Sequence, residues 1–475
     1  MIFNSIQFLL FFIAITVSYY ILTPRFRWVL LLLASCYFYM AFVPEYILIL
    51  FFTIIIDYIA GIFIEKAKGS TRKWLLIISL VSNIGILAIF KYYNFFNENI
   101  SYIYEFFTGQ VRAYQSLDEL FNWGVKMLLP IGLSFHTFQA MSYTIEVYRG
   151  NQKAEKHFGI YALYVMFYPQ LVAGPIERPQ NVIFQLKKHV KYDFENIKSG
   201  LMQMAWGFFK KVVFADRVGL MVDAAYAHQN LHNQSASTLL VATFLYSFQI
   251  YCDFSGYSDI ALGSAKVLGI NLMENFRTPY FSKSIGEFWR RWHISLSSWF
   301  KDYVYFPMGG SRVGVSRTYL NIMTIFLLSG FWHGNTWNFV IWGAIHGLYL
   351  IFGQLKDKFV PEVSFSGKTI VDVFVTFVLV MLAWVFFRAE TLSDAFYVLK
   401  RIFSFDFSQP FVSVLNFNEL IFSVLLLIMI LLKEKYFYKI DTSNSKNFWL
   451  IFICFVSVCY LFGVFQAKQF IYFQF

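Results

Sequence analysis

The sequence predicts an all-α polytopic membrane protein, on two observations. Of its 475 residues, 58% are hydrophobic and only 14% are charged, whereas a soluble domain carries roughly 25% charged residues. The apolar residues also fall in long runs separated by short polar loops. This much apolar surface could not be buried inside a water-soluble globule, so a soluble enzyme, a disordered chain and a disulfide scaffold are excluded.

Apolar runs supply the predicted membrane helices, and we expect about 11 or more of these helices in all. A helix needs about 20 mainly apolar residues to cross the hydrocarbon core. Several of the runs in the middle of the chain are shorter than that. The predicted runs are 2–22, 28–43, 46–64, 74–91, 158–172, 239–251, 319–331, 337–352, 371–387, 417–432 and 447–465.

Lysine and arginine in the short loops predict the orientation. Arg25 and Arg27 follow the first run, and four basic residues lie in each of 65–73 and 433–446, whereas the loop at Pro44 has none. Cytoplasmic loops carry an excess of Lys and Arg, so we expect the three basic loops inside and both chain ends outside. The net charge of +11 thus reflects membrane orientation rather than nucleic-acid binding. No basic segment precedes the first run, so we expect it to be retained as a span.

The centre of the chain is less regular than its ends. The apolar segment 128–148 is interrupted by proline and glycine, and the segment 206–222 carries two adjacent lysines. Irregular or charged segments at membrane depth are tolerated only inside protein or along a wet cavity. We therefore predict a single domain, 1–475, with scaffold helices in 1–125, a catalytic centre in 126–350 and further scaffold helices in 351–475.

A histidine bracketed by glycines and aromatic residues is the first candidate for catalysis. His333 ends an apolar run, in the sequence Ser-Gly-Phe-Trp-His-Gly-Asn at 329–335. An ionisable group at membrane depth is a functional candidate, and imidazole exchanges protons near neutral pH. From composition alone, a hydrogen-bonded packing histidine is an equal alternative.

Two arginines and another histidine stand among tryptophans at 288–293, in Phe-Trp-Arg-Arg-Trp-His. Arg290 and Arg291 fit two interpretations. They are anchors at the membrane interface, or they form a basic cytoplasmic collar for an anionic donor.

A polar, glycine-containing stretch at 249–259 is expected to break the chain between two apolar segments. Asp253 and Asp259 within it could orient substrate hydroxyls or a histidine, with helix caps and interhelical hydrogen bonds as the alternative. The eight histidines show no metal-binding spacing, so we expect no metal site. Nucleophile-elbow and Walker-type loops are absent from the sequence as well.

Taken together and in order, these motifs resemble the membrane-bound O-acyltransferase family, and within it the bacterial alginate O-acetyltransferase branch. The family's two characteristic polar positions fall on His333, in Trp-His-Gly, and on His293, 40 residues earlier. The segments that carry the resemblance are 129–135, 142–150, 172–176, 251–259, 288–296, 307–310 and 332–334.

The resemblance implies acyl transfer from a thioester to a hydroxyl through a central tunnel, with short re-entrant or interfacial helices around it. The implied donor is acetyl-CoA, the acceptor an exported or cell-surface polysaccharide, and the location the bacterial inner membrane, with an extracytoplasmic acetyl-transfer partner protein and no bound cofactor. His333 is then the general base and His293 positions the thioester or substrate. Arg290, Arg291 and Asp253 are candidates for donor or substrate binding.

Three other functions stay open at this point. The first is D-alanyl transfer to teichoic acid from a carrier-protein thioester. The second is a glycan transporter, although the repeated half-structure usual for transporters is not found. The third is a catalytically silent scaffold of a polysaccharide export complex.

Overall fold

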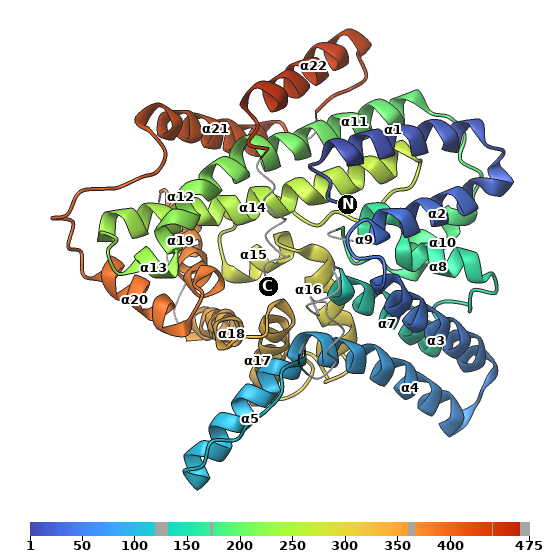
Figure 1. The fold of residues 1–475 in the computed structure, drawn as a ribbon, viewed down its shortest axis with the longest axis horizontal. Helices are drawn as coiled ribbons and strands as arrows, with labels where there is room; N and C mark the ends of the chain where they lie inside the picture. The colour runs from blue at the N-terminus through green and yellow to red at the C-terminus, as the bar shows by residue number, and fades with distance from the viewer. Residues whose placement is uncertain (118, 120–131, 172–173, 360–365, 439, 466–475) are drawn as a thin grey trace. The chain divides into compact units, whose positions relative to one another are not determined.

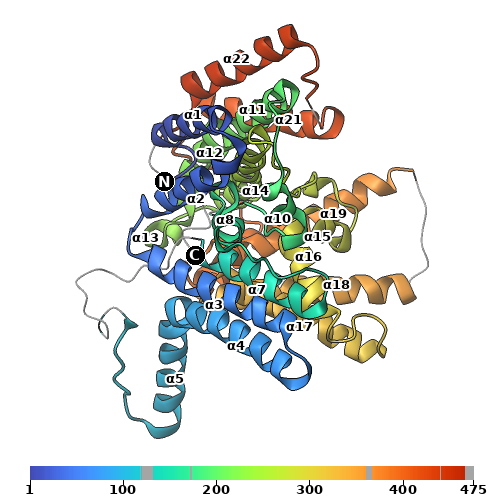
Figure 2. The same ribbon diagram turned by 90° about the vertical axis from the view of Figure 1, so that its right-hand side faces the viewer.

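The computed structural model describes residues 1–117, 119, 132–171, 174–359, 366–438 and 440–465. In these residues the fold is helical, with no strand (Figures 1 and 2). They form two compact units. The first consists of Met1 and the described residues of 3–193 and 264–272, and the second of Ile2 and the described residues of 194–263 and 273–465. The predicted catalytic centre, 126–350, contains residues of both units. The assignment of the whole chain to a single domain stays a prediction.

The first unit contains α1 to α10. Its elements are α1 (Ile6–Ile21), η1 (Pro24–Phe26), α2 (Arg27–Met40), α3 (Tyr46–Lys66), α4 (Gly69–Leu87), the π-helix η2 (Ala88–Tyr92), α5 (Tyr93–Thr108), α7 (Leu133–Arg149), α8 (Phe158–Met166), α9 (Tyr168–Leu171) and α10 (Pro179–Lys187).

The second unit holds the remaining helices, except that the last turn of α14 is grouped with the first unit. Its elements are α11 (Phe194–Phe208), the π-helix η3 (Phe209–Ala215), α12 (Asp216–Tyr226), α13 (His228–Leu231), α14 (Ala236–Val267), η4 (Pro279–Phe281), α15 (Ile285–Arg291), α16 (Ile294–Phe300), the π-helix η5 (Lys301–Tyr305), α17 (Val315–His333), α18 (Trp337–Phe359), α19 (Lys368–Arg388), α20 (Leu392–Phe403), α21 (Phe417–Tyr436) and α22 (Ser445–Phe462).

Five helical segments are long and apolar enough to cross a membrane. Each contains most of one predicted run, so the structure supports an integral membrane protein with at least part of the predicted set of spans. The five segments are Tyr46–Lys66, Gly69–Thr108, Trp337–Phe359, Lys368–Arg388 and Ser445–Phe462.

A buried carboxyl group ties the first unit together. Asp57 of α3 accepts hydrogen bonds from Ser79 Oγ (2.6 Å) and Asn83 Nδ2 (2.8 Å) of α4. Gly61 of α3 lies against the ring of Tyr143 from α7, so closely that a Cβ there would lie 2.6 Å from the ring. Helices α3, α4 and α7 therefore pack side by side (Figures 1 and 2).

The predicted run 158–172 is broken between α8 and α9. Pro169 lacks an N–H, and in an uninterrupted helix its ring would clash with the carbonyl of the preceding turn. Phe167 accordingly leaves the helical region, with φ −51° and ψ 113°. The backbone N–H of Tyr168 donates instead to Ser35 Oγ of α2 at 3.1 Å.

The predicted break at 249–259 is wrong, because α14 passes through this stretch without interruption. Its polar side chains have buried partners: the carboxylate of Asp253 forms an ion pair with Lys211 of η3. Gly256 lets the backbone of Gly207 on α11 come close, since a Cβ at Gly256 would lie 2.8 Å from that carbonyl oxygen. Further bonds join Lys210 to Asp259 and Ser255, and Tyr251 to Glu434.

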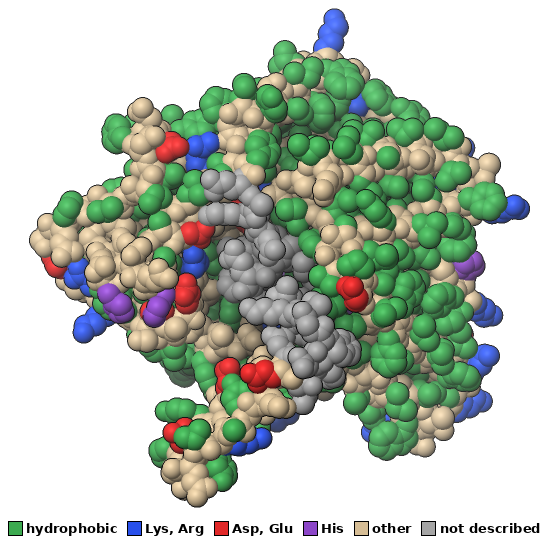
Figure 3. Space-filling model, viewed as in Figure 1, with side chains coloured by type: hydrophobic (Ala, Val, Ile, Leu, Met, Phe, Trp, Pro, Cys, Tyr) green, Lys and Arg blue, Asp and Glu red, His purple; other side chains and the backbone are tan. Residues whose placement is uncertain are grey.

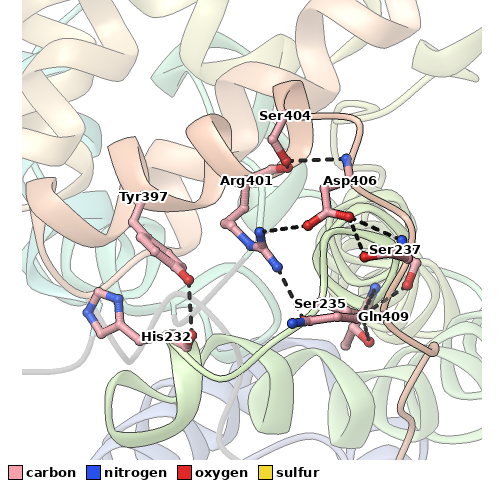
Figure 4. Close-up of polar contacts among 10 residues, drawn as sticks. His232, Ser235, Ser237, Tyr397, Arg401, Ser404, Asp406 and Gln409 are labelled. Atoms are coloured by element: carbon pink, nitrogen blue, oxygen red, sulfur yellow. Dashed lines mark hydrogen bonds and ion pairs between the residues drawn. The ribbon is translucent and has the colours of Figure 1, made fainter.

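Helix α20 is too short to cross a membrane, with 12 residues. It begins with a capping box formed by Thr391 and Asp394. Near its C-terminal end, Arg401 donates to Gln409 Oε1 at 3.3 Å and pairs with Asp406 at 3.5 Å (Figure 4). These bonds fix the loop that follows α20.

Candidate active site

A sharp turn between α15 and α16 holds His293. Ser284 caps the start of α15, with its hydroxyl accepting from the N–H of Glu287. His293 stands at the N-cap of α16 with φ +44° and ψ 54°, in the left-handed region that side chains other than glycine rarely adopt. A backbone in this region costs free energy and persists only where its surroundings fix it.

Asn275 provides that fixation. Its side-chain oxygen Oδ1 accepts from the backbone N–H of Ser295 at 3.2 Å and from Ser295 Oγ at 2.9 Å. Its backbone carbonyl accepts from the N–H of Ile294 at 2.9 Å. The same Oδ1 lies 3.1 Å from Nδ1 of His293. One asparagine therefore anchors the backbone on the C-terminal side of His293 and the imidazole itself.

These contacts fix the tautomer of His293. A backbone N–H can only donate, so the amide atom of Asn275 that faces Ser295 is the oxygen. An oxygen acceptor requires a hydrogen on His293 Nδ1, which leaves the lone pair on Nε2 in the neutral ring. Burial lowers the pKa of His293 to about 3, so the ring is neutral at physiological pH. His293 is thus a buried neutral imidazole with a basic Nε2.

His333 is placed by the end of α17. It is the last residue of that helix, and Gly334 continues in an extended conformation. A Cβ at Gly334 would lie 2.0 Å from the ring of Phe339, so only glycine allows this chain path. The imidazole of His333 is buried, 4% exposed, between Trp332, Trp342 and Phe387 at ring-centroid distances of 4.9, 5.1 and 5.4 Å.

The two histidines lie together in the second unit. Their ring centroids are 6.4 Å apart, although 40 residues separate them in sequence. The two rings are therefore close neighbours in the fold. Phe254 and Phe276 cover His293 at 4.8 and 6.4 Å. The arrangement is a pair of imidazoles inside an aromatic wall.

A third histidine, His346, lies beside this pair and was not predicted from the sequence. His346 of α18 is fully buried and its Nδ1 accepts from Trp289 Nε1 at 3.3 Å. Trp342, one turn earlier on α18, contacts both His333 (5.1 Å) and His346 (4.9 Å). The i, i+4 spacing of Trp342 and His346 was the available signal, because such residues share a helix face.

Sequence comparison decides the family of this site. Residues 152–392, which include both histidines of the pair, match the sequence model of the membrane-bound O-acyltransferase family. The chain belongs to this family. It is therefore a membrane O-acyltransferase, and its relatives place it in the bacterial O-acetyltransferase branch.

Three relatives illustrate these comparisons. A Pseudomonas aeruginosa protein named "Probable alginate O-acetylase AlgI" is 35% identical over 94% of this chain and 84% of its own length. The peptidoglycan O-acetyltransferase of Helicobacter pylori is 34% identical over 84% of this chain and 79% of its own. The teichoic acid D-alanyltransferase of Streptococcus thermophilus is more distant, 28% identical over 64% and 79%.

The other predicted residues of this acyltransferase have different surroundings. Asp253 pairs with the buried ammonium of Lys211, which also contacts Asp216 at 2.8 Å. This ion-pair network favours a packing role for Asp253.

The two predicted arginines differ in their surroundings. Arg291 pairs with Glu287 at 2.6 Å and is half-buried. Arg290 is exposed and has no ion-pair partner among the described residues, so it is the better placed of the two for an anionic ligand.

Metal ligation has no support in the described part of the chain. No group of three or more His, Cys, Asp or Glu side chains is placed there to hold a metal ion. The acyltransferase site is instead built from imidazole, indole and amide groups.

Replacing Asn275 by Ala is expected to lower acyl transfer by about tenfold, mainly in kcat. The change removes the acceptor of His293 Nδ1 and of the Ser295 N–H, so the imidazole loses its fixed tautomer. Ser258→Ala is the matched control, because it removes only a long contact of 3.4 Å from the Asn275 amide nitrogen. Kinetics of the purified variants give the comparison. Equal loss in both variants would assign Asn275 to general packing.

Proposed function

We propose that the enzyme transfers an acetyl group from the cytosolic thioester acetyl-CoA to hydroxyls of an exported or cell-surface polysaccharide. The observation that carries this proposal is the buried pair of His333 and His293. Relatives of about 35% identity named for O-acetylation of alginate and of peptidoglycan support a glycan acceptor.

His333 acts as the general base in this mechanism. Its imidazole takes the proton of the sugar hydroxyl while the hydroxyl oxygen attacks the thioester carbonyl carbon. The tetrahedral intermediate then collapses, the C–S bond breaks, and the thiolate leaves and receives the proton. A positioned base of this kind contributes about 10²–10⁴-fold to the rate. A thioester needs no metal for this step.

His293 positions the reacting groups. Its Nε2 is an acceptor because Asn275 holds the hydrogen on Nδ1. It can therefore hold the acceptor hydroxyl or an amide N–H of the donor, and orient it toward His333. A neutral ring suits this role, since the site then adds no second positive charge beside the base.

The proposal places the reaction across the bacterial inner membrane. More helices than the five long apolar segments would then cross it, around a central tunnel, with the N-terminus outside. Acetyl-CoA would enter from the cytoplasm, and the acetyl group would leave on the outer side, directly to the glycan or through an extracytoplasmic partner protein. No bound cofactor is needed.

The test of this function is a mass-spectrometric comparison of surface polysaccharide from wild-type and His333→Ala cells. Loss of O-acetyl groups at equal protein abundance is the expected result. D-alanyl transfer is the second candidate function, because the chain is 28% identical to a teichoic acid D-alanyltransferase. Consumption of acetyl-CoA without a carrier protein supports the first function, whereas strict carrier dependence supports the second.

Replacing Arg290 by Gln is expected to raise the KM for acetyl-CoA several-fold and to leave kcat nearly unchanged. The guanidinium is exposed and would meet the phosphates of the donor, so its effect should shrink in high salt. Arg277→Gln is the control, since this neighbouring exposed arginine is paired with Glu274 at 2.5 Å. An unchanged KM in Arg290→Gln would return Arg290 to the role of an interfacial anchor.

A further inference from the structure

The first unit contains a cavity of about 690 Å³ that includes no residue of the histidine site. The ends of α1, α2, α8 and α10 surround it. Its floor is apolar: Leu31, Ile160 and Ile270 line it and are buried. Trp28 adds a half-buried indole that contacts the His157 ring edge-on at 4.6 Å. The volume is in the range of ordinary small-ligand sites, about 300–1,000 Å³.

The rim of this cavity is strongly basic. Among the described residues, five Lys and Arg side chains and one acidic side chain, that of Glu155, line the cavity, so the formal charge of its lining is +4 with the histidines neutral. Glu155 is already paired with Lys187 at 2.5 Å. Figure 3 shows Lys and Arg side chains along the right-hand edge of this unit, where helices α1 to α4 end or begin. The lining cations are Arg25, Arg27, Lys156, Lys187 and Lys188.

Not all of these cations are available to a ligand. Arg27 donates to the backbone oxygens of Val190 (2.6 Å) and Leu22 (3.2 Å) and lies over the ring of Tyr19, so it is part of the wall. Arg25, Lys156 and Lys188 are exposed. These three form an open basic rim above an apolar floor.

The cavity lies beside the C-terminal end of α1, where Tyr19 lines it. One face of α1 carries Ile13, Val17 and Ile21, each more than half exposed, with Ile21 at 78%. In an integral membrane protein such a face contacts acyl chains. Arg25, on the cavity rim, follows four residues after Ile21, so the rim lies at the end of this apolar helix. Basic side chains at that level face lipid headgroups.

We propose that this cavity binds the headgroup phosphate of an anionic phospholipid, with the acyl chains along α1. The open rim supplies positive charge for the phosphodiester, and the apolar floor accepts the glycerol backbone and the first methylenes. The phosphates of a soluble nucleotide share the same charge chemistry, but the position of the rim at the end of a helix with an exposed apolar face favours the lipid. This site is independent of the proposed acetyl transfer.

Native mass spectrometry of the full-length protein in detergent tests the site. Phosphatidylglycerol is the probe, phosphatidylcholine the neutral control, and adenosine 3′,5′-bisphosphate the soluble phosphate. The triple variant Arg25→Gln, Lys156→Gln, Lys188→Gln is compared with a control of equal charge loss, Lys66→Gln, Lys68→Gln, Lys73→Gln. The control lysines are exposed, lie at the end of α3, between α3 and α4 and in the first turns of α4, and do not line the cavity.

The expected result is retention of phosphatidylglycerol over phosphatidylcholine by the wild type and the control. The cavity variant should bind phosphatidylglycerol about 10- to 100-fold more weakly, since each Lys or Arg near a headgroup raises the affinity on the order of a few-fold. Equal retention by the cavity variant, equal loss in both variants, or preference for the bisphosphate would each overturn the proposal. The single change Lys188→Glu gives the same comparison if the triple variant unfolds.

Discussion

Cells carrying His333→Gln should lose about 99% or more of their glycan O-acetylation. Glutamine keeps a polar side chain of similar reach but has no nitrogen that accepts and releases a proton near neutral pH. If His333 is the base, the loss is about 10²-fold or more. Acetyl content of the surface glycan and abundance of the protein, measured in the same cells, give the result.

The matched control for this variant is His232→Gln. His232 is an exposed histidine of the same unit. Its ring lies 4.4 Å from the ring of Tyr397, centroid to centroid, and its backbone oxygen accepts a hydrogen bond from the Tyr397 hydroxyl. Its replacement should leave acetylation and abundance unchanged. If His333 were only a packing group, the opposite pattern would appear in His333→Gln: reduced protein with normal acetylation per molecule.

Gly330→Ala is expected to remove most of the folded protein. A Cβ at Gly330 of α17 would lie 2.2 Å from the backbone oxygen of Phe339 on α18, and helix backbones cannot yield as side chains do. Overpacking of this kind costs about 1–3 kcal/mol or more of the free energy of unfolding. Because His333 lies one turn further on α17, a displaced helix also disturbs the catalytic pair. Thermal unfolding of the detergent-solubilised variants gives the measurement.

Gly353→Ala provides the comparison for Gly330→Ala. Gly353 lies on α18, and a Cβ there would meet no atom within 4 Å. Alanine favours a helix over glycine, so this change should be neutral or slightly stabilising. A Gly330→Ala protein that unfolds at the wild-type temperature would show that α17 and α18 do not need this close approach.

The sequence predicted helices well where hydrophobicity alone decides them. Five of the predicted runs coincide with long apolar helical segments, since a membrane span is selected by length and composition. The prediction of helix continuity failed where the conformation depends on partners that are distant in sequence. The polar stretch 249–259 suggested a break, but Lys210 and Lys211 satisfy its side chains and the helix continues. Nothing local to the stretch indicates those lysines.

The candidate site shows the same limit. The Trp-His-Gly motif pointed to His333, and the structure brings His293 to within 6.4 Å of it, ring to ring. Asn275 was not predicted, because an asparagine in a polar loop is unremarkable until the turn at His293 places it under the imidazole. The left-handed backbone of His293 likewise has no sequence signal, since glycine is the residue expected there.

The central claim is that His333 removes the proton of the acceptor hydroxyl during attack on an acetyl thioester. The most direct measurement is transfer of radiolabelled acetyl from acetyl-CoA to acceptor glycan by purified protein in proteoliposomes, for the wild type and His333→Gln at equal reconstituted amounts. The account predicts transfer by the wild type without carrier protein, and a rate at least about 10²-fold lower for the variant. Transfer by His333→Gln at close to the wild-type rate would contradict it.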